Sequence, residues 1–517
     1  MKPKGLRQAM AWLHTWSSLW LGWLMFVIFL TGTLSYYRQE ITAWMQPELA
    51  MSQPSAGSAQ LALRKLAEVA PDAERWTVYL PTDRGNTLRI AWPRPQAAGA
   101  APQARRAVQT LTLDAGSGAV LEPRATAGGE FLYRMHFELY GLSRDTARWI
   151  VGIATLAMFV ALLSGVITHK KIFREFFTFR PGKALRSWLD GHNASAVLAL
   201  PFYLMITYSG LVLLAATLLP WNEGGRRVPA PASEVRASGL STATEAIPIA
   251  DILAQAEQRW GQPPSRFTLL DPGTPRALLE VLPTRNDALS QQSGSGGVGD
   301  VKLWFDPASG VMLDEQRRDP GSVISRIDTS LGSLHRARFA PGGLRALFFL
   351  AGALGTLMIV TGLVMWPLKR RSPGGAIPRH VQVVDRLNIG IVAGLMVAVA
   401  AYFWANRLLP AGLAGRVGGE LTVFFLAWLA CLLLPFLMRS PKSAWVLQLT
   451  LAAGLYGLIP VLDLATRAGV AGGAPALLAF DALCLGGGLA LLATAWRVHR
   501  HRPVVRPAPH GARQTVA

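Results

Sequence analysis

Two histidines stand eighteen residues before a glycine, each inside a strongly apolar stretch: His14 precedes Gly32, and His192 precedes Gly210. Eighteen residues make five turns of an α-helix, so each histidine shares a helix face with its glycine, about 27 Å away along the axis. Histidine is uncommon in membrane helices because burying its polar ring requires a partner. Histidines repeated in this way suggest ligands for a flat, apolar redox group, and haem is the first candidate.

Further histidines extend this pattern to two expected layers. His136 and His335 each precede another apolar stretch and are expected near the outer leaflet, where together they would supply both axial ligands of an outer haem. For an inner haem, three histidines lie at matching depth: His14, His169 and His192. Spacing alone does not choose two of these three. The glycines are expected to leave room for a haem to approach the helix backbone.

Three arginines flank the outer histidines. Arg134 lies beside His136, and Arg336 and Arg338 follow His335. Guanidinium groups bind carboxylates and other oxyanions, so these side chains are candidates for contacts with haem propionates or with an anionic chelate. Ordinary basic residues at the membrane interface are the alternative. No catalytic residue separate from the candidate haem ligands stands out.

The stretches that carry the histidines are expected to be membrane helices. Hydrophobic residues make up 51% of the chain and charged residues 16%, which is too apolar for a soluble protein of this length. Eight apolar runs reach the roughly 20 residues needed to cross a bilayer as a helix, and Pro201 is expected to kink the third. They are residues 16–37, 148–168, 194–219, 344–366, 387–405, 420–438, 444–462 and 476–496.

The placement of charge indicates the topology. Lysines and arginines crowd the short segments after the second, fourth, sixth and eighth runs, which all lie on one side if the N-terminus is cytoplasmic. Short loops rich in these residues stay inside, so the net charge of +20 is a topology signal and does not indicate nucleic-acid binding. Both chain ends are therefore expected in the cytoplasm.

Two long polar segments fall on the outer side and repeat the same order of elements. Each begins with a helical pattern, continues with strand-like runs and closes with a hairpin, whose turns are Asp114–Gly118 and Asp306–Gly310. Aspartate at the start and glycine at the end suit such a turn, through side-chain capping and positive φ. Residues 12–168 and 190–366 thus form an internal duplication. The fold class expected is an all-α polytopic membrane bundle of about eight helices with two periplasmic α+β modules.

The expected division of the chain follows from these boundaries. It comprises the N-terminus and first span (1–37), the first periplasmic module (38–146), the second span (147–168), a basic cytoplasmic loop (169–193), the third span (194–219), the second periplasmic module (220–342), the fourth span (343–366), a cytoplasmic loop (367–386), the last four spans (387–496) and a disordered basic tail (497–517).

Several long motifs resemble the PepSY-associated transmembrane family. The resemblance covers nearly all of residues 10–465, and at one position the chain departs from it: relatives often have Leu-Pro-Phe-His where this chain has Tyr203, so a ligand role there is not expected. The motifs are His169–Lys183, His192-Asn193, Leu200-Pro201-Phe202, Tyr208–Leu211, Leu334–Phe339 and Tyr402–Pro410.

This resemblance implies a fold and an activity. The outer modules look like PepSY domains, and the family includes iron-regulated inner-membrane proteins of Gram-negative bacteria, among them haem-containing ferric-siderophore reductases. It implies two b-type haems and reduction of Fe(III) chelates at the periplasmic face. Carried over residue by residue, the candidate haem ligands are His14, His136, His169, His192 and His335.

The expected function is therefore that of a haem-dependent oxidoreductase of the bacterial inner membrane, which passes electrons to a periplasmic ferric-siderophore or other Fe(III) chelate and releases Fe(II) for iron uptake. The chain has no dinucleotide-binding fingerprint or Walker A motif, so the electrons would come from a quinol or a cytoplasmic reductase. Two alternatives are a non-enzymatic PepSY binding or regulatory protein anchored in the membrane, and a transporter of siderophore or iron.

Overall fold

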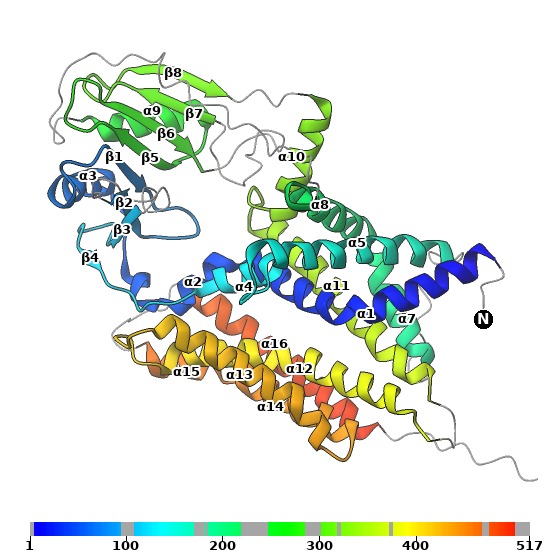
Figure 1. The fold of residues 1–517 in the computed structure, drawn as a ribbon. Helices are drawn as coiled ribbons and strands as arrows, with labels where there is room; N and C mark the ends of the chain where they lie inside the picture. Colours follow the sequence, from blue (N-terminus) through cyan, green and yellow to red (C-terminus); the bar gives the residue numbers. More distant parts are fainter. Residues whose placement is uncertain are drawn as a thin grey trace, which may run out of the picture.

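The computed structural model describes residues 5–94, 108–169, 180, 185–218, 247–284, 301–317, 322–371, 376–467 and 475–501. Within these, long helices form a bundle, and an antiparallel sheet stands at one end of it (Figure 1). Most of the expected basic loop, residues 170–179 and 181–184, and most of the expected tail, residues 502–517, lie outside the described residues.

The first half of the chain contains α1 (Leu6–Ser35), α2 (Arg38–Met45), a short 3-10 helix η1 (Pro47–Met51), α3 (Ser58–Val69), β1 (Arg75–Tyr79), β2 (Leu88–Pro93), β3 (Val108–Leu113), β4 (Val120–Leu121), α4 (Gly128–Glu138) and α5 (Arg144–Thr168). The same order then recurs as α7 (Leu185–Leu198), α8 (Leu200–Leu218), α9 (Ile249–Trp260), β5 (Pro264–Leu270), β6 (Leu278–Pro283), β7 (Val301–Phe305), β8 (Met312–Arg317), α10 (Val323–Arg336) and α11 (Gly342–Lys369). The chain closes with α12 (Arg379–Leu408), α13 (Arg416–Leu437), α14 (Pro441–Gly457), α15 (Ile459–Thr466) and α16 (Pro475–Arg500).

The described residues contain seven single spans, counting α14 with α15 as one, that are long and apolar enough to cross a membrane. A further candidate is the pair α7 and α8, which together pass the same test but are bent by 69° where they meet. The break lies at Ala199, directly before Leu200-Pro201, because proline lacks an N–H group and disfavours helical geometry in the residue before it. The kink expected at Pro201 is confirmed, and the bent pair brings the total to the predicted eight.

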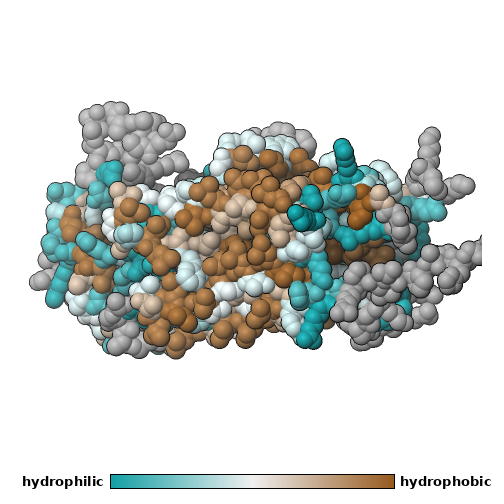
Figure 2. Space-filling view, turned by 90° about the horizontal axis from the view of Figure 1, so that it is seen from below, coloured by the Kyte–Doolittle hydropathy of each residue, from teal (hydrophilic) through white to brown (hydrophobic). Residues whose placement is uncertain are grey.

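The outer surface of the bundle is apolar over a broad band. Figure 2 views the side formed by α12–α16 and shows hydrophobic residues across the middle, with hydrophilic residues at both ends. Leu429 and Leu433 of α13 and Leu489 of α16 are at least half exposed on this surface. Exposed leucines in a regular band are what a hydrocarbon environment favours, so a lipid bilayer is the medium that this surface fits.

The two outer modules share one sheet instead of forming two. Its strand order is β4-β3-β2-β1-β5-β6-β7-β8, and β1 pairs antiparallel with β5, with Val78 opposite Phe267. Leu63 of α3 and Ile252 of α9 belong to one core with these strand residues, so both helices cover the same face. The strand order is symmetrical about the β1–β5 seam, which agrees with the duplication seen in the sequence. The fold is therefore a helical bundle with helices and strands outside it, as expected, but the two expected α+β modules are joined through one eight-stranded sheet.

Both predicted hairpin turns form as the sequence indicates. The carboxylate of Asp114 accepts a hydrogen bond from the backbone N–H of Ser117 at 2.9 Å, and Gly118 has a φ of 75°. The carboxylate of Asp306 accepts from the backbone N–H of Ala308 at 3.1 Å and from the hydroxyl of Ser309, the counterpart of Ser117, at 2.8 Å, and Gly310 has a φ of 70°. Positive φ carries little cost for glycine, which has no Cβ, so both hairpins repeat one local solution.

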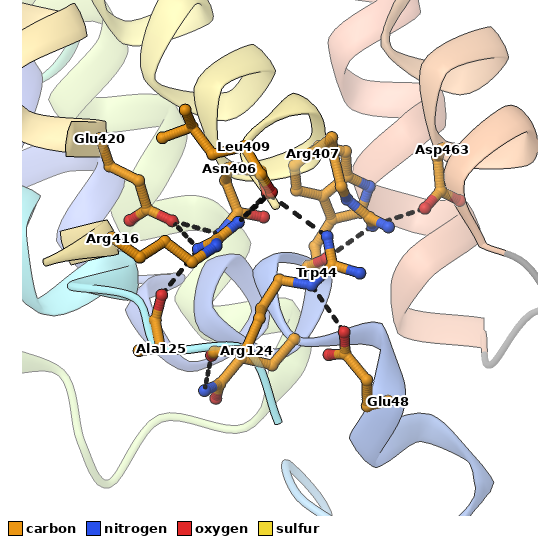
Figure 3. Close-up of polar contacts among 11 residues, drawn as sticks. Trp44, Glu48, Arg124, Ala125, Asn406, Arg407, Leu409, Arg416, Glu420 and Asp463 are labelled. Carbon is orange, nitrogen blue, oxygen red and sulfur yellow. Dashed lines mark hydrogen bonds and ion pairs between the residues drawn. The ribbon is translucent and has the colours of Figure 1, made fainter. Parts of the chain in front are cut away.

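Helices α12–α16 are attached to the first repeat by buried polar contacts at the sheet end (Figure 3). Arg407 donates hydrogen bonds to Asp463 at 2.5 Å and to the backbone oxygen of Trp44 at 2.6 Å, and its guanidinium lies 4.1 Å from the centre of the Trp44 ring. The indole N–H of Trp44 donates to Asp481 at 2.9 Å. These contacts join α12, α15 and α16 to α2.

A second buried pair, Arg416 with Glu420, holds the segment that leads into α4. Glu420 accepts a hydrogen bond from the Thr126 hydroxyl at 2.7 Å, and the Tyr402 hydroxyl donates to the backbone oxygen of Gly128 at 3.0 Å. Both contacts lie at the beginning of α4. The C-terminal helices therefore fix the position of that helix.

We predict that this attachment depends on the buried Arg407–Asp463 pair, in which both side chains are fully buried. Replacing Arg407→Met removes one of the two cations that pair with Asp463, the other being Arg467, and also removes the hydrogen bond to the backbone oxygen of Trp44. We expect this to lower the free energy of unfolding by up to about 3–5 kcal/mol. The control Lys65→Ala removes an ion pair with the exposed Glu68 and costs about 1 kcal/mol or less. Thermal unfolding in one detergent compares the two variants, and equal shifts in Tm would contradict the prediction.

Candidate functional site

Two histidines face each other at the sheet end of the bundle. His136 belongs to α4 and His335 to α10, which occupy equivalent places in the two repeats. Their ring centroids are 6.0 Å apart, and the ring planes make an angle of 41°. The pair expected from the sequence is therefore brought together by the fold.

A second pair lies at the opposite end. His14 of α1 and His192 of α7 have ring centroids 6.3 Å apart and planes at 75°. Both line a cavity of about 780 Å³ between α1, α5, α7, α8 and α11. His169 lines the same cavity from the end of α5. Of the three inner histidines left open by the sequence, His14 and His192 are the two whose rings face each other. Which two of the three would bind a haem stays a prediction.

Each of these four imidazoles packs against a glycine of a neighbouring helix. A Cβ atom added to Gly32 would lie only 2.6 Å from Nδ1 of His136, so no larger residue fits there without displacing the ring. The glycines make room for the histidine rings, a role that the sequence did not suggest. Whether they also make room for a haem stays a prediction. The contacts are His14 with Gly165, His136 with Gly32, His192 with Gly362 and His335 with Gly210.

We call each of these four contacts between a glycine and an imidazole a glycine seat. The helix that carries the glycine also supplies a hydrogen-bond acceptor for Nδ1 of the imidazole. In three seats it is the carbonyl oxygen four residues before the glycine, which lies one turn away on the same helix face, and the missing Cβ lets the ring reach it. For His335 the acceptor is the Ser209 hydroxyl at 2.9 Å, and the carbonyl of Ile206, four residues before Gly210, also contacts this ring. The other three bonds join His14 to Ala161 (2.8 Å), His136 to Ile28 (2.8 Å) and His192 to Met358 (2.9 Å).

These hydrogen bonds set the chemistry of the rings. A carbonyl oxygen only accepts, so Nδ1 carries the proton and Nε2 keeps its lone pair for a metal. At the outer pair, burial lowers the pKa of His136, and burial together with the nearby charges of His136 and Arg336 lowers the pKa of His335 to about 3. Both shifts favour the neutral imidazole, which is the form that binds a metal.

Both pairs have the separation that one metal ion between two imidazoles requires. With metal–nitrogen bonds of about 2.0 Å and each nitrogen about 1.15 Å from its ring centre, two opposite ligands have centroids about 6.3 Å apart. The observed values are 6.0 Å and 6.3 Å. The separations of both pairs agree with the bis-histidine haems that the family resemblance implies. The inner pair also lines a cavity with the apolar lining that a porphyrin needs.

Three arginines gather beside the outer pair. Two of them are among the three expected, and the third, Arg38, is not. Arg336 and Arg338 lie there, and burial lowers the pKa of both guanidiniums, with like charge from Arg38 adding to the effect. Arg38, at the start of α2, was missed because nothing in its local sequence points to the site. Arg134 pairs with Glu138 at 3.0 Å on the surface of α4, and its contact with an anion stays a prediction.

Sequence reasoning also missed two of the four glycine seats. Gly165 and Gly362 stand in apolar helices where many small residues occur, and neither follows a histidine at the eighteen-residue spacing. Ser209 lies within the motif Tyr208–Leu211, but a hydroxyl in an apolar helix does not by itself predict a contact with a distant histidine. Gly165 and Gly362 stand at equivalent places in the last helix of their repeats, α5 and α11. This correspondence is the signal in the sequence that could have identified them.

We predict that Gly32→Ala displaces His136, because its new Cβ would lie 2.6 Å from Nδ1. Overpacking of this kind costs about 1–3 kcal/mol, and the ring also loses its bond to Ile28. The matched control is Gly362→Ala, whose Cβ would lie an ordinary 3.4 Å from the His192 ring. The measurements are the Tm and the haem content of the two purified variants. A loss of Tm or haem in Gly362→Ala as large as that in Gly32→Ala would contradict the prediction.

The fold and the two histidine pairs define a polytopic membrane protein with a duplicated helical core, one histidine of each pair coming from each repeat. Residues 11–369 match the family described as the PepSY-associated TM region. The chain belongs to this family. The match includes both repeats and ends where α11 ends, so helices α12–α16 lie outside it. No curated protein matches the chain.

Proposed function

We propose that the protein is a haem-containing oxidoreductase of the bacterial inner membrane, which passes electrons across the bilayer to an Fe(III) chelate on the sheet side. The observation that carries this proposal is the pair of bis-histidine geometries, with centroids 6.0 Å and 6.3 Å apart, at opposite ends of the bundle. His14 and Gly32, which seats His136, are separated by about 27 Å of α1, close to the roughly 30 Å of a hydrocarbon core. When bound, b-type haem supplies reversible one-electron transfer.

At the inner end the chain's own residues would bind and orient the cofactor. His14 and His192 both line the cavity, and their Nδ1 bonds to backbone carbonyls hold the rings in place and leave Nε2 available for a metal. Lys369 and Arg370 line the same cavity, and Arg370 lies 3.8 Å from the Trp366 ring. These cations suit propionate carboxylates. A quinol or a cytoplasmic reductase would deliver electrons at this end.

At the outer end the basic residues would favour an anionic acceptor. Arg336 lies close enough to act on His335, and Arg38 and Arg338 lie close to Arg336, so the three cations form one group beside the outer pair. Their positive charge suits propionates or the oxygen-rich surface of a ferric-siderophore. Hard-oxygen chelators hold Fe(II) much more weakly than Fe(III), so reduction would release the iron for uptake.

The distribution of charge supports a cytoplasmic position for the end opposite the sheet. The described basic residues at the helix ends there follow the pattern of loops that remain inside, and α1 begins and α16 ends on this side (Figure 1). The sheet would then lie in the periplasm. These residues are Lys369, Arg370, Arg371, Arg379, Arg439, Lys442, Arg497 and Arg500.

Haem stoichiometry tests the proposed ligand pairs. We expect the wild type to show a Soret band and to carry two haems, and His335→Ala to lose the outer one while the inner one stays. His192→Ala should do the reverse, and His169→Ala, the matched control in the same cavity, should keep both. Absorbance of oxidised and dithionite-reduced protein measures this. Colourless protein from haem-replete cells would contradict the proposal and favour a non-enzymatic binding role.

Vectorial electron transfer tests the activity itself. In liposomes with a reduced donor inside and a ferric-siderophore outside, we expect Fe(II) to appear outside, detected by a ferrous-specific chelator. His14→Ala and His136→Ala should each abolish the signal, because each would interrupt one of the two sites. Movement of the intact chelate across the membrane without any donor would instead identify a transporter.

A further inference from the structure

The sheet carries a groove on the face opposite α3 and α9, at the seam between the two repeats. Its volume is about 270 Å³. Its floor is a row of small side chains, Ala91, Thr77 and Thr268, which are direct neighbours on β2, β1 and β5. Trp76 and Val78, on either side of Thr77, point into the core under the helices, so the floor residues face the other way.

Larger side chains form the two walls. On one side, Tyr79 stands between Arg89 and Arg266, its direct neighbours on β2 and β5. The Arg89 and Arg266 guanidiniums lie 4.1 Å and 5.8 Å from the centre of the Tyr79 ring. Arg75 borders the other side. Four residues of strand and one strand spacing separate Arg75 from Arg266, which puts their Cα atoms about 14 Å apart.

The charges around this groove are unbalanced. Glu280, the single acid among the described residues that line it, is paired with Lys302 at 2.7 Å. Among the residues that the structure describes, no carboxylate forms an ion pair with Arg75, Arg89 or Arg266. The Nε of Arg266 is buried and has no hydrogen-bond partner. A buried donor of this kind normally has an acceptor, so this N–H group is available to an anion that enters the groove.

We propose that the groove binds a small organic anion with two or more carboxylates. A volume of about 270 Å³ holds on the order of ten non-hydrogen atoms, because one water takes about 30 Å³. The planar fork of Arg266 on one side and that of Arg75 on the other each match a carboxylate. The Thr77 and Thr268 hydroxyls on the floor offer further hydrogen bonds. Both repeats contribute, so the site exists only because β1 and β5 pair.

This site is separate from the histidine pairs and does not rest on the proposed function. Isothermal titration of citrate into the purified full-length protein should give saturable binding that weakens as salt is added. Arg266→Ala and Arg75→Ala should each weaken it about tenfold, the loss expected for one charged hydrogen-bonding partner. Arg266→Lys should retain part of the affinity, since lysine keeps the charge but lacks the fork. His335→Ala should bind citrate as the wild type does.

Two controls separate a built site from general attraction to a basic surface. Arg276→Ala removes the same charge from the exposed turn between β5 and β6, outside the groove, and should leave the affinity unchanged. Thr77→Trp keeps every charge but fills the groove, and should abolish binding while far-UV circular dichroism stays unchanged. The proposal is overturned if wild type shows no saturable binding at millimolar citrate, if Arg276→Ala weakens binding as much as Arg266→Ala, or if pyrophosphate binds and citrate does not.

Discussion

The contact between an imidazole on one helix and a glycine on the next sets the geometry of the bundle's core. Without a Cβ, each glycine lets a ring reach the carbonyl one turn earlier, whose second lone pair the helix leaves unused. His14 is held this way by α5 and His136 by α1, and the second repeat holds His192 and His335 by α11 and α8. Because backbone atoms fix Nδ1, the opposite nitrogen of each ring has a defined direction, and each pair joins one histidine from each repeat.

The sheet outside the bundle also depends on a contact between the two repeats. Each repeat contributes four strands, and the edge that a lone module would expose at β1 is covered by β5 of the other. Pairing at this seam removes an unprotected edge and also places Arg75 and Arg266 on two sides of one groove. Duplication therefore creates sites at interfaces between the copies, both in the membrane and above it, that neither copy holds alone.

Helices α12–α16 break this symmetry, since their buried ion pairs contact the first repeat. Arg407 and Asp481 hold Trp44 of α2, and Glu420 holds the segment that leads into α4. Buried charges contribute little net stability but make one arrangement specific, because any other leaves them unpaired. The consequence falls on α4, which carries His136. A role in fixing one half of the outer pair is thus a physical reason for these helices to accompany the duplicated core.

Local patterns in the sequence determined the number of spans, the duplication, the five candidate histidines, the kink at Pro201 and the two hairpin turns. Each depends on residues close together in the chain, through apolar length, helical periodicity or turn chemistry. The tertiary structure alone decided that His14 faces His192, that β1 joins β5, and that the glycines seat rings. These features depend on contacts between segments far apart in the chain, and spacing along one helix carries no information about which neighbouring helix, or which copy of the repeat, will pack against it.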